Sequence, residues 1–306
     1  ARAGYGYFVR DLTHSATTRA CIFGTLHTDA TLELMHQLKD AGLSAFVGKL
    51  AMDRNSPDSY REPSAAAGLA ETRRWLDACK AENSLHAGPV RPMITPRFTP
   101  STGDEYMAGL GQLAAEYHVP AQSHLSENPG EIAWVAELCP GTKFYGESYS
   151  RYGLFGGDVP TVMAHCPTSN ENVIAGIAPA AKYLRGGWRI GLGSDVAGGH
   201  TLDLFTVMAT AVQVSKLRWR YVDQSEKPLT MTEALYMATV GGGDFWADFG
   251  EKVGLFEDGY AFDALVLEDA ALENMRSFTP AERLERYAYL GKGALAAKFA
   301  QGQKLL

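Results

Sequence analysis

Short apolar runs alternate with longer amphipathic stretches over most of this sequence. Apolar runs bounded by turn residues predict strands, and apolar positions three or four residues apart predict helices. The predicted strands are Arg19–Thr25, Ser44–Leu50, Val90–Phe98, the segment carrying His124, Thr161–Cys166 and Arg189–Gly193. The predicted helices are Ala30–Ala41, Ala65–Asn83, Asp104–His118, Asn128–Leu138 and Ala178–Arg185. This alternation indicates a parallel sheet, and the number of units favours a TIM-type (β/α)8 barrel over an open sheet.

The alternation becomes less regular toward the end of the chain. Helical spacing covers Leu202–Arg218, Thr230–Thr239 and Pro280–Tyr289, and Thr230 or Thr232 is a suitable N-cap. Strand-like runs cover Lys252–Phe256, Phe262–Leu267 and Ala297–Leu306. The last of these runs resembles a terminal hairpin strand.

Composition narrows the classes of function. The chain has 306 residues, of which 46% are hydrophobic and 21% charged, as expected of an ordinary globular protein. The formal net charge of -7 argues against nucleic acid and anionic membranes as partners. The four cysteines form no CxxC pair, and no long apolar run predicts a membrane span. The first residues do not resemble a signal peptide, so we expect a cytoplasmic protein.

Titratable side chains stand at the ends of the predicted strands. In a barrel of this kind the chemistry lies at the carboxyl ends of the strands, so these positions are informative. The six side chains are those of His27, Lys49, Arg97, His124, His165 and Asp195. His27 has no ligand partner nearby in the sequence, so it either lines the site or makes hydrogen bonds within its loop.

The segment Gln122–Asn128 carries the clearest candidate chemistry. Neutral imidazole is a common zinc ligand, so His124 is a candidate for holding a metal. Glu127 follows three residues later, where a carboxylate could move a proton of a metal-activated water. The alternative is a surface histidine followed by a solvated glutamate at a helix start. That alternative is favoured for an isolated HxxE pattern. The neighbouring motifs make the metal-binding interpretation stronger here.

Two further strand ends supply groups of the same kind. Asp195 closes the apolar run that starts at Arg189 and could bind a metal or accept a proton, although an Asx turn or a helix cap explains it equally well in isolation. His165 could hydrogen-bond an attacking water, and the alternative is a histidine at the edge of the core bonded to the backbone.

Arg97 and Phe98 combine a guanidinium group with an aromatic face. This pair suits a planar heterocycle, because the guanidinium can bond to a carbonyl oxygen while the ring stacks. A surface ion pair for Arg97 and a core position for Phe98 are the structural alternatives.

Together these motifs closely resemble the guanine deaminases of the amidohydrolase superfamily. The resemblance is carried by TPRF, QSHLSEN, AHCPTSN and GLGSDVAGG in this order, supported by GTLHTDAT, VGKLAMDRN and FDALVLED, and it extends over residues 8–306. It implies that His124 and Asp195 are metal ligands and that Glu127 is the proton shuttle. It also implies that His165 lies near the attacking water and that Arg97 and Phe98 contact the purine.

The sequence departs from this family's pattern in two places. Family members have a first barrel strand that ends in HxH and supplies two zinc ligands, and no HxH occurs in this sequence. The resemblance also implies that one βα unit is missing before AHCPTSN, which leaves about six readable barrel strands. We therefore expect an incomplete barrel over residues 1–248, followed over residues 249–306 by the C-terminal part of a small β-sandwich. With two protein ligands instead of three, we expect this chain alone to bind zinc weakly or not at all.

The function implied by the resemblance is hydrolysis of guanine to xanthine and ammonia. The expected cofactor is zinc, one ion per subunit of the complete protein, and the expected assembly is a homodimer. Two alternatives stay open: a non-catalytic or fragmentary homologue without bound metal, and a deaminase of another aminated heterocycle.

Overall fold

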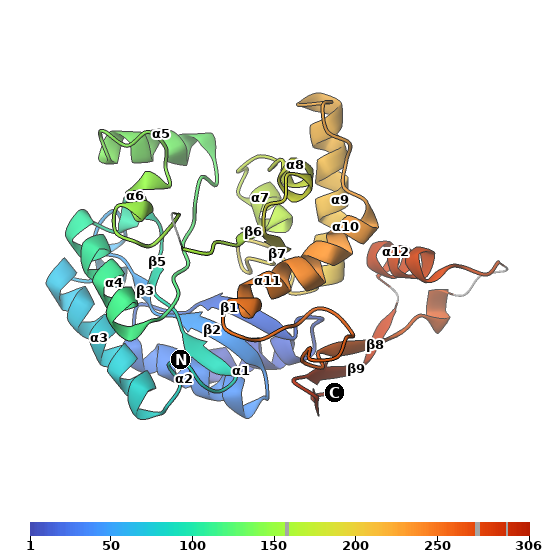
Figure 1. The fold of residues 1–306 in the computed structure, drawn as a ribbon, viewed down its shortest axis with the longest axis horizontal. Coiled ribbons are helices and arrows are strands. Elements are labelled where there is room, and N and C mark those ends of the chain that lie inside the picture. Colours follow the sequence, from blue (N-terminus) through green and yellow to red (C-terminus); the bar gives the residue numbers. More distant parts are fainter. Residues whose placement is uncertain (157–158, 273–275, 292) are drawn as a thin grey trace. The chain divides into compact units, whose positions relative to one another are not determined.

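The predicted alternation of strands and helices is present in the computed structural model, which describes residues 1–156, 159–272, 276–291 and 293–306 (Figure 1). The chain divides into two units. The first unit comprises Ala1–Arg10 and Arg19–Val159, and the second comprises Asp11–Thr18 and Pro160–Leu306. The predicted division at residues 248 and 249 stays a prediction.

The first unit is built from consecutive βα repeats. Its strands are β1 (Arg19–Phe23), β2 (Ser44–Gly48), β3 (Leu50–Ala51), β4 (Val90–Pro92) and β5 (Thr95–Pro96). Its longer helices are α2 (Thr28–Asp40), α3 (Ala65–Ala81), α4 (Asp104–Tyr117) and α5 (Pro129–Leu138), and its short ones are η1 (Asp58–Tyr60), η2 (Thr99–Ser101) and α6 (Glu147–Ser150). A further helix, α1 (Arg2–Thr13), lies in a stretch for which the apolar pattern predicts no element, and its last residues belong to the second unit.

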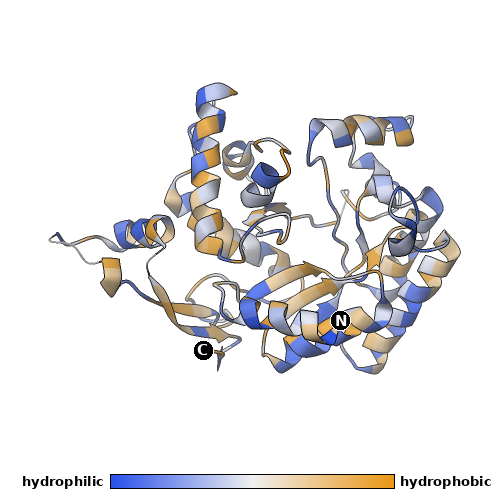
Figure 2. Cartoon of the chain, turned by 180° about the vertical axis from the view of Figure 1, so that it is seen from behind, coloured by the Kyte–Doolittle hydropathy of each residue, from blue (hydrophilic) through white to orange (hydrophobic). Residues whose placement is uncertain are grey.

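The strands of the first unit pair in parallel and in chain order. β2 lies between β1 and β4, and β3 pairs with β5. All five residues of β2 are buried, because this strand lies between β1 and β4 and packs against helix α2. In Figure 2 these strands are mostly hydrophobic, whereas the helices mix both kinds of residue. A side chain at Gly48 would collide with Thr95, so β2 requires glycine at this close approach.

Two strand predictions in the first unit need correction. Val90–Phe98 is interrupted between β4 and β5, where Met93 N still donates to Val47 O but Ile94 N donates to Pro120 O. The predicted strand before His124 is reduced to one bridge between Ile94 and Ala121. Proline at position 120 offers no N–H, and beyond the bridge the side chains bond to neighbouring backbone.

The second unit begins with another parallel strand pair and a group of helices. β6 (Met163–His165) pairs with β7 (Ile190–Leu192). The helices are α7 (Pro167–Asn172), α8 (Ala180–Arg185), α9 (Leu204–Tyr221), α10 (Met231–Tyr236), the π-helical turn η3 (Met237–Gly241), α11 (Gly242–Ala247), η4 (Ala270–Leu272) and α12 (Pro280–Leu290). Thr230 is the N-cap of α10 and forms a capping box with Glu233, which confirms one of the two predicted caps.

An antiparallel sheet closes the chain where the sandwich was expected. It consists of β8 (Ala264–Glu268), β9 (Ala294–Ala300) and β10 (Gln303–Lys304), with β9 in the middle. The prediction of a strand at Lys252–Phe256 is wrong, because Gly254 takes a positive φ of 94° and lies against the backbone of Thr239. The predicted strand Ala297–Leu306 is two strands, since the chain turns at Gln301 and Gly302.

None of the described helices combines the length and the apolar composition needed to cross a membrane.

Candidate active site

In the first unit, His124 is anchored by the main chain of Arg97. The Arg97 carbonyl oxygen accepts from His124 Nδ1 at 2.7 Å and from His124 N at 3.2 Å. A carbonyl oxygen can only accept, so the imidazole proton belongs on Nδ1 and the lone pair on Nε2. This arrangement is typical of metal-binding histidines, whose second nitrogen is fixed by a backbone carbonyl. His124 therefore fits the predicted role of ligand.

Aromatic rings surround the same imidazole. The centroid of Phe23 lies 4.8 Å from that of His124, and the centroid of Phe98 lies 6.5 Å away in an edge-on arrangement. Trp134 of α5 is edge-on to Phe98 at 6.2 Å. Phe98 thus belongs to an aromatic group beside His124. It is half-buried and not a core residue, so part of its ring is accessible for stacking on a ligand.

Arg97 is exposed, and among the described residues its guanidinium contacts Met52 and Phe98 and no carboxylate, so the surface-ion-pair alternative is not supported. Its Cζ lies 5.3 Å from the centroid of the Phe98 ring. Within the described part of the chain, the guanidinium contacts Met52, with Nη1 3.8 Å from Sδ. A guanidinium without a carboxylate partner can bind a ligand oxygen.

Glu127 is half-buried in the loop before α5. The N-cap of α5 is Asn128, whose Oδ1 accepts from Glu131 N at 2.9 Å. Glu127 thus precedes the helix instead of belonging to its first turn. Its predicted role as proton shuttle stays a prediction.

In the second unit, His165 and Asp195 stand at the same end of the β6–β7 pair. His165 is opposite Leu192 in the register, and Asp195 follows three residues later. Ser169 Oγ donates to Asp195 Oδ2 at 2.5 Å, so this oxygen is held by α7. Asp195 is exposed and takes a positive φ of 45°, and the cap of the next long helix is Asp203, so Asp195 caps no helix there.

His165 is almost completely buried, with an exposed fraction of 4%. Burial lowers the pKa of its imidazole to about 4, so the ring is neutral near pH 7. Its Nε2 has no hydrogen-bond partner among the described residues. Such a buried polar atom needs an explanation, and a water or substrate atom would provide one.

The other strand-end residues have different environments. Lys49 is buried, and its Nζ lies 2.7 Å from Glu62 Oε1. Burial lowers the pKa of Lys49, while the hydrogen bond with Glu62 opposes this shift. His27 is exposed at the start of α2, and its ring is edge-on to Tyr60 at 6.1 Å. Lys49 thus forms an internal ion pair, and His27 keeps both of its interpretations.

A residue that the sequence patterns did not single out also reaches this region. Tyr149 of α6 is buried, and its hydroxyl group contacts both the segment that follows Arg97 and the segment that carries His124. An isolated tyrosine between turn residues carries no spacing signal, so only the tertiary contacts reveal it.

The predicted metal ligands His124 and Asp195 belong to different units. Within the described ranges, no group of three or more His, Cys, Asp or Glu side chains could hold a metal ion. The shared metal site of His124 and Asp195 stays a prediction.

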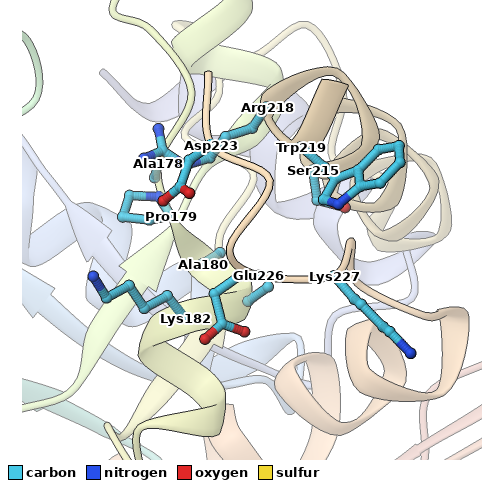
Figure 3. A pocket seen from close by; sticks show the side chains of 11 residues that line it. Ala178, Pro179, Ala180, Lys182, Ser215, Arg218, Trp219, Asp223, Glu226 and Lys227 are labelled. Carbon is cyan, nitrogen blue, oxygen red and sulfur yellow. The ribbon is translucent and has the colours of Figure 1, made fainter. Parts of the chain in front are cut away.

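A surface pocket in the second unit contains none of these residues (Figure 3). Basic and acidic side chains line it together, including those of Lys182, Arg218, Asp223 and Glu226. Arg218 Nη1 donates to the carbonyl oxygen of Ile177 at 2.8 Å. This pocket is therefore separate from the predicted chemistry.

Comparison with known proteins identifies the relatives of this chain. A guanine deaminase of Dictyostelium discoideum is 31% identical over 326 aligned positions, which cover 98% of this chain and 71% of the relative. A probable guanine deaminase of Schizosaccharomyces pombe is 33% identical, over 89% of this chain and 55% of the relative. The chain thus spans between about half and 71% of the length of these two relatives.

Solved structures agree with this relationship. A crystal structure of guanine deaminase from C. acetobutylicum, with guanine bound in the active site, is 41% identical and superimposes with a TM-score of 0.91. The superposition covers all of this chain and 75% of the C. acetobutylicum chain. An adenosine deaminase from Xanthomonas campestris with bound zinc has the same fold at 19% identity, with a TM-score of 0.77 over 99% of this chain and 69% of that chain.

These matches confirm the predicted α/β fold class of the amidohydrolase kind and the resemblance to guanine deaminases. The number of missing barrel strands stays a prediction. The model of the amidohydrolase family matches residues 1–293, and the chain therefore belongs to the amidohydrolase family.

Proposed function

We propose that this protein hydrolyses guanine to xanthine and ammonia. One observation carries the proposal: the Arg97 carbonyl oxygen accepts from the ring Nδ1 and from the backbone N of His124. The segment predicted to contact a purine is thereby fixed directly to the segment predicted to hold the metal. The relationship to guanine deaminases, one of them solved with guanine in its active site, supports this substrate over other heterocycles.

In the proposed mechanism, Arg97 and Phe98 orient the purine. The guanidinium bonds to the ring carbonyl oxygen, and the phenyl face packs on the planar ring. Glu127 takes a proton from the attacking water and delivers it to the ring nitrogen beside the amino-bearing carbon. Water adds to that carbon, and collapse of the tetrahedral adduct releases ammonia. Asp195 assists in accepting the proton of the water, and neutral His165 hydrogen-bonds the water.

We propose that the cofactor is a metal ion, namely one zinc ion per subunit. When zinc is bound, the water at such a site becomes a stronger acid. His124 Nε2 and the Asp195 carboxylate are donors that zinc accepts. We also propose a homodimer in the cytoplasm. Metal analysis of the natural full chain, light scattering and localisation of a tagged copy test these three points.

Turnover by the natural full chain tests the function. Metal-loaded protein is incubated with guanine, adenine, cytosine and other aminated heterocycles, and ammonia and the deaminated product are quantified. We expect xanthine and ammonia in equal amounts from guanine. Preferential turnover of another compound would establish the alternative substrate, and no turnover of any compound by metal-loaded protein would indicate a non-catalytic homologue.

A further inference from the structure

Tyr149 joins two segments of the first unit that are distant in sequence. Its hydroxyl group donates to the carbonyl oxygen of His124 at 2.8 Å and accepts from Thr99 N at 3.0 Å. Ser123 Oγ lies 2.9 Å from the same hydroxyl oxygen and 2.7 Å from Pro96 O. One phenol thus reaches the main chain just after Arg97 and Phe98, and the main chain of His124 itself.

The environment of Tyr149 makes this contact rigid. The ring is buried in a cluster with Met107, Val135, Cys139 and Tyr145, and its exposed fraction is 3%. Burial raises the pKa of the Tyr149 hydroxyl, so it keeps its proton at neutral pH and can donate. Thr99 is also held beside the tyrosine, because Thr99 Oγ1 lies 2.6 Å from Ser148 Oγ.

We propose that Tyr149 is a positioning residue that holds the purine-contacting segment of Arg97 and Phe98 in register with the segment of His124. Its effect on catalysis rests on the proposed function, whereas its effect on the two segments does not. The hydroxyl adds a link between Thr99 and His124 to those that the Arg97 carbonyl and Ser123 Oγ already make. Each link joins a different pair of residues, so together they fix both the separation and the relative rotation of the segments.

The neighbouring Tyr145 provides a matched control. The two rings stack with centroids 5.8 Å apart at 14°, and both are buried in the same cluster. The hydroxyl of Tyr145, however, makes no hydrogen bond to the described residues 97–101 or 122–126, and its polar neighbours are Glu131 and Tyr149. Tyr149→Phe and Tyr145→Phe therefore remove the same atom from equally buried rings, and only the first removes the connection between the segments.

Hydrogen exchange and kinetics of both variants test the proposal in the metal-loaded full chain. For Tyr149→Phe we expect amide exchange within residues 97–101 and 122–126 to accelerate roughly 10-fold, as the loss of one hydrogen bond implies. We expect kcat/KM for guanine to fall about 10- to 100-fold, with a raised KM and a lowered kcat. The physical reason is that displacing Arg97 and Phe98 by about 1 Å relative to His124 would misorient the purine. Tyr145→Phe should leave exchange in both segments and kcat/KM unchanged.

Unchanged exchange in either segment of Tyr149→Phe would overturn the proposal, as would equal effects of the two substitutions. If Tyr149→Phe does not fold, residue-resolved exchange of the wild-type chain decides instead, because the Thr99 amide donates to the Tyr149 hydroxyl. Slow exchange of the Thr99 amide supports the proposal, and exchange at the rate of an unprotected amide overturns it. A wild-type protein that does not deaminate guanine would contradict the proposed function, and the exchange result would still decide the role of Tyr149.

Discussion

His124 and His165 both stand at the ends of strand-like segments, yet their environments are opposite. His124 is half-buried and bonded through Nδ1 to the Arg97 carbonyl, which leaves Nε2 with a lone pair. His165 is almost fully buried, its pKa is lowered to about 4, and its Nε2 has no partner among the described residues. A hydrogen bond sets the tautomer of the first imidazole, and burial sets the charge of the second.

The difference agrees with the two roles proposed for these histidines. A ligand needs an oriented lone pair, which a backbone carbonyl provides. A group that hydrogen-bonds a neutral water needs no charge, and desolvation keeps imidazole neutral. If the surroundings of His124 contain the reaction machinery and burial governs His165, substitutions near His124 change turnover, whereas pH changes the contribution of His165 to stability.

The largest effect is expected near His124, from Glu127→Gln. The substitution keeps the shape of the side chain but removes the proton carrier, so turnover should fall by about 10²–10⁴-fold in the metal-loaded full chain. Metal content and thermal stability should stay nearly constant. The control is Glu137→Gln, which changes an exposed glutamate of α5. If Glu127 were only a helix-start carboxylate, the variant would lose about 0.3–1 kcal/mol of stability and keep its rate.

A smaller loss is expected from Arg97→Ala in the same region. Removing a charge-assisted hydrogen bond to the purine should cost about 1.5–3 kcal/mol of transition-state binding, which lowers kcat/KM by about 10- to 100-fold. Arg151→Ala is the matched control, because this exposed arginine also lies over the following aromatic ring, with Cζ 5.8 Å from the centroid of Tyr152. Steady-state kinetics with unchanged kcat/KM would make Arg97 a structural residue.

The burial of His165 predicts how stability depends on pH. The unfolded imidazole binds a proton near pH 6.5, whereas the folded one does so only near pH 4. Between these values the unfolded state takes up a proton that the folded state excludes. The contribution of His165 to stability is therefore fully present above about pH 6.5 and is lost by about 1.4 kcal/mol per unit as the pH falls toward 4.

Urea unfolding of wild type and His165→Gln at pH 7 and pH 5.5 measures this dependence. In His165→Gln, the free energy of unfolding should depend less on pH, because the contribution of His165 is removed. The control variant His86→Gln, at an exposed histidine, should keep the pH dependence of wild type. Equal slopes in wild type and His165→Gln would show that the buried imidazole takes up its proton at the same pH in the folded protein as in the unfolded chain.

The smallest effect is expected at the cap that follows Glu127. Asn128→Ala removes the acceptor for Glu131 N and should lower the free energy of unfolding by about 1 kcal/mol. Ser64→Ala, at the cap of α3, should cost a similar amount. We expect only Asn128→Ala to lower kcat/KM as well, because its cap fixes the chain beside Glu127. Equal kinetics of the two variants would show that the cap serves only the helix.

Much of the fold follows from local pattern. Buried strands such as β1 and β2 and amphipathic helices such as α3 and α4 lie where apolar spacing predicts them. The failures occur where tertiary contacts replace local pairing. Lys252–Phe256 has strand composition, but a glycine with positive φ packs on another backbone segment. Helix α1 was missed because it contains two glycines, Gly4 and Gly6, whose helix propensity is low, although the helix is as amphipathic as α2.

The sequence by itself determined the family, the order of the strands and helices, and the residue types available for chemistry, because motifs and periodicity are local properties. It also placed Arg97 and His124 near strand ends. Only the tertiary structure decided that the Arg97 carbonyl orients His124, that burial keeps His165 neutral, and that the hydroxyl of Tyr149 connects two distant segments. These properties depend on which atoms meet and on how much water is excluded, and neither quantity is encoded in the spacing of residues along the chain.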